Sequence, residues 1–169
     1  AGLECANDRL LALMDKGITL ERTRRICSAL ADSGIMVHVY LMYAFPTQTP
    51  EEVLGALEFT RDLFADGLIQ SAYWHRFALT VHSPIAANPA RFGIELLPLT
   101  LDGPRFALNE IPYRDSHSSA DVELPPPNIE EPRFALNETP RRNSHSSACD
   151  AMGEGLRIAT YNYMRGAGL

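Results

Sequence analysis

The sequence predicts an α/β fold in which parallel strands are joined by crossover helices. Two runs rich in β-branched and aromatic residues, at 35–45 and 69–81, are each preceded by segments with helical spacing of apolar residues. Helices of about 10 to 15 residues between strands are typical of right-handed crossovers, which leave the joined strands parallel. The expected order is therefore helix, helix, strand, helix, strand.

Start signals mark the three helices of this pattern. Asn7 or Asp8 is the expected N-cap of a first, short helix, and Thr19 is the expected N-cap of a second. In "TPEE", Thr49 and Glu52 form a capping box with a proline at the first helical position, worth roughly 1 kcal/mol. This third helix is predicted to begin within a few residues of the end of the first strand.

Alternation along the strands predicts two different sheet faces. One face of the first strand should pack on helices and consists of Val37, Val39, Leu41 and Tyr43. The other face is mixed and partly polar, with His38, Tyr40, Met42 and Ala44. In the second strand the more polar set is Trp74, Arg76, Ala78 and Thr80, which we expect to continue the mixed face. A partly polar inner face favours the lumen of a TIM-type (β/α) barrel, of which this chain would supply one part.

The last third of the chain contains a close internal repeat. Residues 104–120 return as residues 132–148 with an offset of 28, and 14 of 17 positions are identical. Both copies are flanked by proline and polar at their ends, so we expect residues 101–147 to pack weakly and at least one copy to be irregular. The predicted organisation is a partial barrel over 1–100, the duplicated segment over 101–148 and a terminal helix over 149–169.

Composition narrows the classes of partner and the compartment. With 15 basic and 21 acidic residues the net charge is -6, and no basic run indicates nucleic acid binding. Three scattered cysteines favour a reduced, cytoplasmic protein, and the longest apolar stretch is too short to cross a membrane. We expect a small-molecule substrate. Because the chain starts without methionine and stops in mid-pattern, we also expect an excerpt of a longer protein, whose missing N-terminal half would be its partner.

Three motifs resemble one enzyme family in their order and spacing. They are "GLECANDRLLALMDKGIT", "SGIMVHVYLMYAFPTQTPEE" and "AYWHRFALTVHSPI". Over roughly residues 1–98 and 150–169 the chain resembles the C-terminal half of a radical S-adenosylmethionine barrel, of the kind often joined to a cobalamin-binding domain. Members carry G-x-[EQ]-S-[GA], a basic residue about a dozen positions later, and G-[FL]-P after the next strand. Here cysteine replaces the serine (Cys5) and alanine replaces the glycine of the last motif (Ala44).

The resemblance implies a set of cofactor-binding residues. Glu4 and Lys16 would hold polar groups of S-adenosylmethionine, and Tyr40 and the turn made of Ala44, Phe45 and Pro46 would border the same concave site. A carboxylate can accept from ribose hydroxyls or an amino group, and a lysine can pair with the methionine carboxylate. Lys16 could equally be a solvated lysine at the end of a helix. His38, Trp74 and Arg76 are weaker candidates for lining the substrate, since each could be purely structural.

The resemblance also implies chemistry that this chain cannot supply alone. In the family a CxxxCxxC motif binds the [4Fe-4S] cluster that cleaves S-adenosylmethionine, and no such motif occurs here. We therefore assign no catalytic and no metal-binding residue, and expect a cluster bound by another region, with cobalamin as a further candidate cofactor. Two alternatives stay open. One is a non-catalytic remnant that binds a nucleotide-like ligand or a protein; the other is a TIM-like hydrolase using His38, Tyr40 and His75.

Overall fold

The structure is a computed structural model and describes residues 1–98, 109–115 and 147–168. Three strands, β1 (Gly2–Glu4), β2 (His38–Tyr43) and β3 (Ser71–Arg76), form one sheet in the order β1-β2-β3. Both pairings in this sheet are parallel. The predicted α/β class with parallel strands and crossover helices is therefore confirmed.

The predicted start signals begin the helices as expected. Side chains of the N-caps Asn7 and Thr19 accept hydrogen bonds from backbone N–H groups of α1 (Asp8–Leu13) and α2 (Leu20–Asp32). Before α3 (Pro50–Ala65), Thr49 and Glu52 form both hydrogen bonds of a capping box, which satisfies N–H groups that a helix end leaves free.

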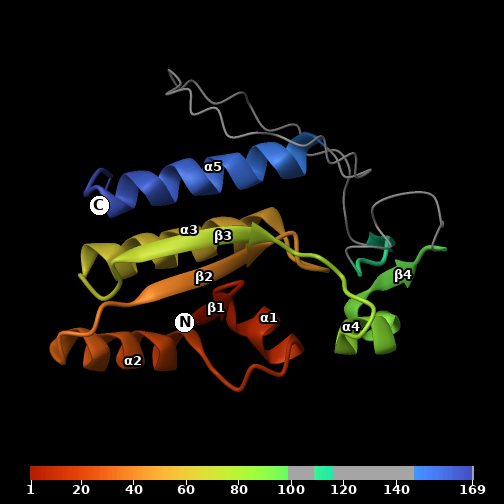
Figure 1. The fold of residues 1–169 in the computed structure, drawn as a ribbon, viewed down its shortest axis with the longest axis horizontal. Helices are drawn as coiled ribbons and strands as arrows, with labels where there is room; N and C mark the ends of the chain where they lie inside the picture. Colours follow the sequence, from red (N-terminus) through yellow and green to blue (C-terminus); the bar gives the residue numbers. More distant parts are fainter. Residues whose placement is uncertain (99–108, 116–146, 169) are drawn as a thin grey trace.

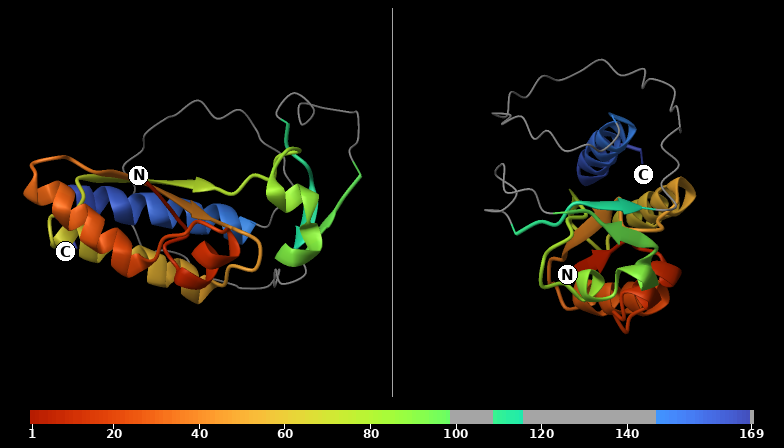
Figure 2. Two further views of the ribbon diagram at one scale, coloured as in Figure 1. Left: turned by 90° about the horizontal axis from the view of Figure 1, so that it is seen from below. Right: turned by 90° about the vertical axis from the view of Figure 1, so that its right-hand side faces the viewer.

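The helices cover one face of the sheet, which here is called the covered face. Figures 1 and 2 show α2, α3 and the terminal helix α5 (Ser147–Met164) following one another around the same side of the strands. The first hydrophobic cluster lies between them and contains the four residues predicted to face helices, Val39, Leu41 and Tyr43 of β2 and Val37 just before it. Such burial of alternate residues fixes which face of each strand is turned away from the helices.

The predicted faces of β3 were wrong. The parallel register places Leu41 beside Trp74 and Tyr40 beside Tyr73. Trp74 is therefore on the covered face, where it is 1% exposed and its Nε1 donates to Thr160 Oγ1 at 2.8 Å. Arg76 lies on that face too and contacts Asp150 of α5 at 3.2 Å. The two residues were assigned to the mixed face because their side chains carry polar groups. Tryptophan and arginine can nevertheless bury their apolar parts once the polar tip has a partner.

A second structural unit follows β3, which ends at Arg76 and does not reach Val81 as predicted. It comprises the four-residue helix α4 (Pro84–Ala87), the 3-10 helix η1 (Pro89–Phe92) and a hairpin of β4 (Ile94–Leu96) with β5 (Tyr113–Asp115). We call it the capping unit. A second hydrophobic cluster joins it to the sheet and includes Cys5, Leu10, Met42, Phe45, Leu79, Phe92 and Ile94. Figure 1 shows this unit beyond the C-terminal ends of β2 and β3.

The domain boundaries predicted from sequence change in one respect. Helix α5 packs on β3 and α3 and buries Leu156 in the first cluster, so it belongs to the sheet's own core. The capping unit and the duplicated segment consequently lie within the connection from β3 to α5. Most of the duplicated segment falls outside the described residues; of the first copy, Tyr113–Asp115 forms β5, so that copy is at least partly regular. Nowhere in the described part is a helix both long and apolar enough to span a membrane.

Candidate functional site

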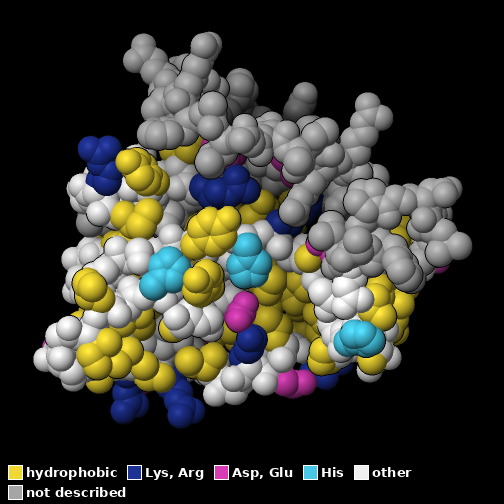
Figure 3. Space-filling view, in the orientation of Figure 1, with side chains coloured by type: hydrophobic (Ala, Val, Ile, Leu, Met, Phe, Trp, Pro, Cys, Tyr) yellow, Lys and Arg dark blue, Asp and Glu magenta, His cyan; other side chains and the backbone are white. Residues whose placement is uncertain are grey.

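The face of the sheet turned away from the helices carries the candidate site and is here called the open face. Alternation and register assign to it Gly2 of β1, His38, Tyr40 and Met42 of β2, and Ser71, Tyr73 and His75 of β3. A register shift places Glu4 beside Leu41, and the Glu4 side chain reaches the open face by lying over Gly2. Tyr40 and Tyr73 are neighbours across the strands and are 51% and 52% exposed. Figure 3 views this side of the molecule, where histidines lie among hydrophobic side chains close to an acidic and a basic group.

Glu4 and Lys16 meet at the β1 side of the open face. Lys16 Nζ donates to Glu4 Oε1 at 2.8 Å, although 12 residues separate them in sequence. Glu4 folds back over Gly2, since a Cβ on that glycine would lie 2.8 Å from Glu4 Oε1. Gly2 is the register partner of Tyr40. The structure therefore brings the Glu4 carboxylate and the Lys16 ammonium together next to the strand that carries Tyr40. Their role in binding a cofactor stays a prediction.

His38 lies at the N-terminal end of β2, opposite the C-terminal edge at which parallel sheets bind ligands. It is the first residue of β2, its Nδ1 is 2.6 Å from Ser71 Oγ, and its ring packs edge-on against Tyr40. Ligands of such folds bind at the C-terminal ends of the strands. The two side-chain partners of His38 are thus a hydroxyl and an aromatic ring, not a carboxylate that would orient the ring for hydrolysis. His75 lies closer to the C-terminal edge, beside Met42.

The turn after β2 shares the C-terminal edge with Glu4 but does not line the open face with its side chains. Because β1 and β2 are parallel, both strand ends lie at one edge. Ala44 has a left-handed backbone, with φ of 59°, a conformation that glycine adopts without strain. Phe45 is 2% exposed and Pro46 is also fully buried. Contrary to the expectation that they border a concave site, these two side chains are not open to the surface: Phe45 packs in the second cluster with residues of the capping unit, and Pro46 is buried as well.

Cys5 behaves as a core residue. It is fully buried in the second cluster, and burial is the main cause that raises the pKa of its thiol, followed by the charge of Glu4. A raised pKa keeps the thiol protonated, whereas metal ligands and nucleophiles are thiolates. Among the described residues no group of three His, Cys, Asp or Glu side chains could hold a metal ion.

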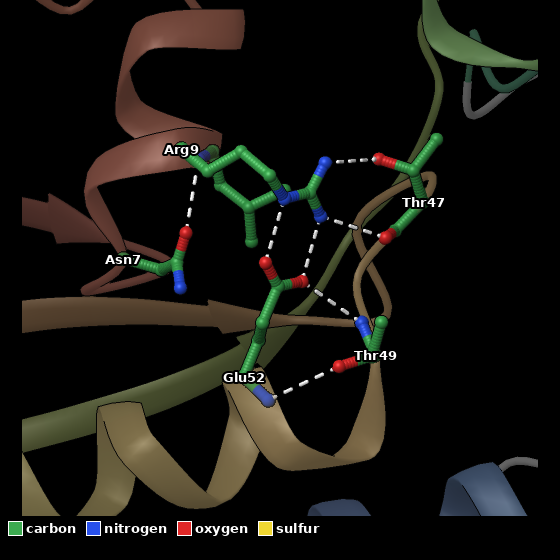
Figure 4. A network of polar contacts seen from close by, with 6 residues as sticks. Asn7, Arg9, Thr47, Thr49 and Glu52 are labelled. Carbon is green, nitrogen blue, oxygen red and sulfur yellow. Dashed lines mark hydrogen bonds and ion pairs between the residues drawn. The ribbon is translucent and has the colours of Figure 1, made fainter.

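An arginine that the sequence interpretation missed joins two elements at the C-terminal edge. Arg9 of α1 donates from Nε and Nη2 to the two Glu52 carboxylate oxygens, each at 2.7 Å. Its Nη2 and Nη1 also donate to the Thr47 carbonyl at 2.9 Å and to Thr47 Oγ1 at 3.2 Å (Figure 4). The hydrogen bond from Arg9 is the first cause that lowers the pKa of Glu52. No sequence signal pairs Arg9 with Glu52, because 43 residues separate them.

Two hollows on the described surface lie away from the open face. One of about 480 Å³ runs along α2, and one of about 200 Å³ lies against β4 and the residue Arg114. Neither includes a residue of the open face. The open face is exposed at Tyr40 and Tyr73 and is bounded at one end by the capping unit.

Comparison with known proteins assigns no family. No protein-family model, curated protein or solved structure matches the chain. The roles considered for these residues rest on their geometry and on the sequence motifs.

Proposed function

We propose that the chain is part of a radical S-adenosylmethionine enzyme and forms one wall of its cofactor and substrate site. In this proposal the three strands are part of a TIM-type barrel, the covered face is its outside and the open face lines its lumen. In the described part of the chain the long helices α2, α3 and α5 lie on the covered face, which supports this, because a parallel sheet is stable when both faces are covered or when it closes on itself. The three sequence motifs are the second support.

The observation that carries the proposal is the Glu4 and Lys16 pair beside Tyr40. A carboxylate and an ammonium at hydrogen-bond distance match the two charged ends of an α-amino acid, such as the methionine part of the cofactor. The side chains of Lys16 and Glu4 are 41% and 18% exposed, and a pair so open to solvent is worth about 0–1 kcal/mol. A zwitterionic ligand can replace such a pair at little cost and extend its base over the Tyr40 ring.

The described residues do not fit an iron-sulfur cluster. Cys5 and Cys27 are buried, Cys149 is half-buried, and no three candidate ligands converge. In the proposal another polypeptide segment, an N-terminal half, binds the [4Fe-4S] cluster, which when bound supplies the electron that cleaves S-adenosylmethionine to a 5'-deoxyadenosyl radical. The residues of this chain bind and orient the cofactor, and the remaining open face, with Tyr73 and His75, contacts a small-molecule substrate.

One observation favours a second candidate, a non-catalytic binding protein. In the described part of the chain no strand pairs with the outer edge of β3, and Tyr73 on that strand is half exposed. Such an edge can accept a strand from another protein. The two candidates differ in chemistry: only the first requires S-adenosylmethionine to be cleaved.

The test is to express the complete reading frame that encodes this chain, reconstitute it anaerobically with iron and sulfide, and add a reductant and S-adenosylmethionine. The proposal expects a CxxxCxxC motif in that reading frame and formation of 5'-deoxyadenosine, reduced at least tenfold by Glu4→Gln if Glu4 holds the cofactor through a charged hydrogen bond. Arg24→Gln, which removes an ion pair between α2 and Asp66 away from the open face, is the matched control. An intact reading frame without the cluster motif would refute the enzyme and favour the binding protein.

A further inference from the structure

Two turns at the C-terminal edge share an unusual backbone. At the end of β1, Glu4 and Ala6 have φ of 57° and 42°; after β2, Ala44 and Thr47 have φ of 59° and 67°. These left-handed conformations cost free energy for any residue with a side chain, most of all for a β-branched one such as Thr47. They persist where surrounding contacts determine the backbone, and they gather at functional sites.

Thr47 is held from two sides. Its carbonyl oxygen and its Oγ1 accept from Arg9, and its backbone N–H donates to Asp115 of the capping unit at 3.2 Å. Figure 4 shows the Arg9 guanidinium lying between Thr47 and Glu52. Both backbone polar groups of this strained residue are therefore bound by side chains from other elements.

Arg9 also connects the second turn to the first. It lies in the first turn of α1, the helix that begins directly after the Glu4 to Ala6 turn and whose N-cap is Asn7. Glu52, its other partner, belongs to the capping box at the start of α3. A single guanidinium thus ties the segment that carries Glu4 to the turn that follows β2.

We propose that Arg9 is a positioning residue that fixes the two turns of the C-terminal edge relative to each other, and thereby the placement of Glu4 against Tyr40. The role in ligand affinity depends on the function proposed above, whereas the role in the geometry of the turns does not. The planar fork of arginine is required, because lysine has the same charge but cannot serve both Glu52 oxygens and the Thr47 carbonyl.

Backbone amide resonances of the labelled full chain test this role without any ligand. We expect Arg9→Lys and Arg9→Gln to shift the amide resonances of residues 4–6 and 44–48 and to speed their hydrogen exchange about tenfold or more, the effect of losing charged hydrogen bonds. The matched control is Arg24→Gln. This change removes the ion pair between Arg24 of α2 and Asp66 at the C-terminal end of α3, and it should leave both turns unchanged.

A second variant separates positioning from general stability. Glycine accepts the backbone of residue 47 without strain, so Thr47→Gly combined with Arg9→Gln should return the 44–48 resonances toward their wild-type positions. Where S-adenosylmethionine binds the wild type, Arg9→Lys should weaken it about tenfold for the same loss of contacts. If the turns respond but no ligand binds, the proposed function fails and positioning stands. Unchanged turns in both Arg9 variants, or uniform changes across the chain, would overturn the role of Arg9.

Discussion

Gly153 of α5 lies directly against the ring of Tyr43, the last residue of β2. A Cβ at position 153 would be 2.2 Å from Tyr43 Oη, closer than any real contact. The same hydroxyl receives a hydrogen bond from Arg157 Nη2 at 3.3 Å. The terminal helix therefore packs on the sheet as closely as its sequence allows, although the long connection described above separates it from β3.

Gly153→Ala should destabilise the protein because the new methyl group needs space that Tyr43 fills. We expect the free energy of unfolding to fall by about 1–3 kcal/mol, the usual cost of overpacking. Gly155→Ala is the matched control: nothing lies within 4 Å of its Cβ position, and alanine is the better helix former by about 1 kcal/mol. Urea unfolding, followed by the fluorescence of the one tryptophan, Trp74, measures both. Equal effects of the two changes would show that α5 does not pack as described.

Ala44→Gly should stabilise the protein, which is the opposite of the usual effect of glycine. At φ of 59° alanine is strained, and glycine is not, so we expect a gain of up to about 1 kcal/mol in the free energy of unfolding. The control is Ala12→Gly in α1, an exposed helical position where the same change should cost about 1 kcal/mol. A loss of stability at both positions would contradict the left-handed backbone of Ala44.

Glu52 should make stability depend on pH in a defined direction. The Arg9 hydrogen bond lowers its pKa below the ordinary value of 4.5. The stabilising contribution is then complete above about pH 4.5 and is lost as the pH falls through the lower pKa of the folded protein. We expect the difference in unfolding free energy between wild type and Glu52→Gln to be larger at pH 7 than near pH 3.

The Arg9→Gln background is the control for this pH dependence. Without Arg9 the main cause of the lowered pKa is gone, so the Glu52→Gln difference should vary less between the two pH values. The same variation with and without Arg9 would mean that the two side chains do not interact in solution.

Local signals in the sequence were sufficient for much of the fold. The N-caps Asn7, Thr19 and Thr49 predicted where helices start, and the alternation along β2 predicted the covered face. Each of these signals depends on residues only a few positions apart in the sequence. The faces of β3 depended on register against β2, which no local pattern encodes. The capping unit was missed because short strands and one-turn helices carry little periodicity.

The candidate site was predicted in part for the same reason. The family resemblance implied that Glu4 and Lys16 serve one site, and the structure places the two side chains 2.8 Å apart. Burial of Phe45 could not be predicted, since it results from a unit that begins at Pro84, about forty residues later in the chain. The Arg9 contacts to Glu52 and Thr47 are equally non-local.

A ligand titration of the isotope-labelled chain tests the open-face site most directly. S-Adenosylmethionine and adenosine are titrated separately, and amide and aromatic resonances are followed. We predict shifts at Glu4, Lys16, Tyr40 and Tyr73 with a dissociation constant of about 1 mM, as one wall of a site would give. Lys16→Met should weaken S-adenosylmethionine but not adenosine, which lacks the carboxylate that Lys16 pairs with. Shifts confined to other surfaces, or equal weakening of both ligands, would contradict a cofactor site at Glu4 and Lys16.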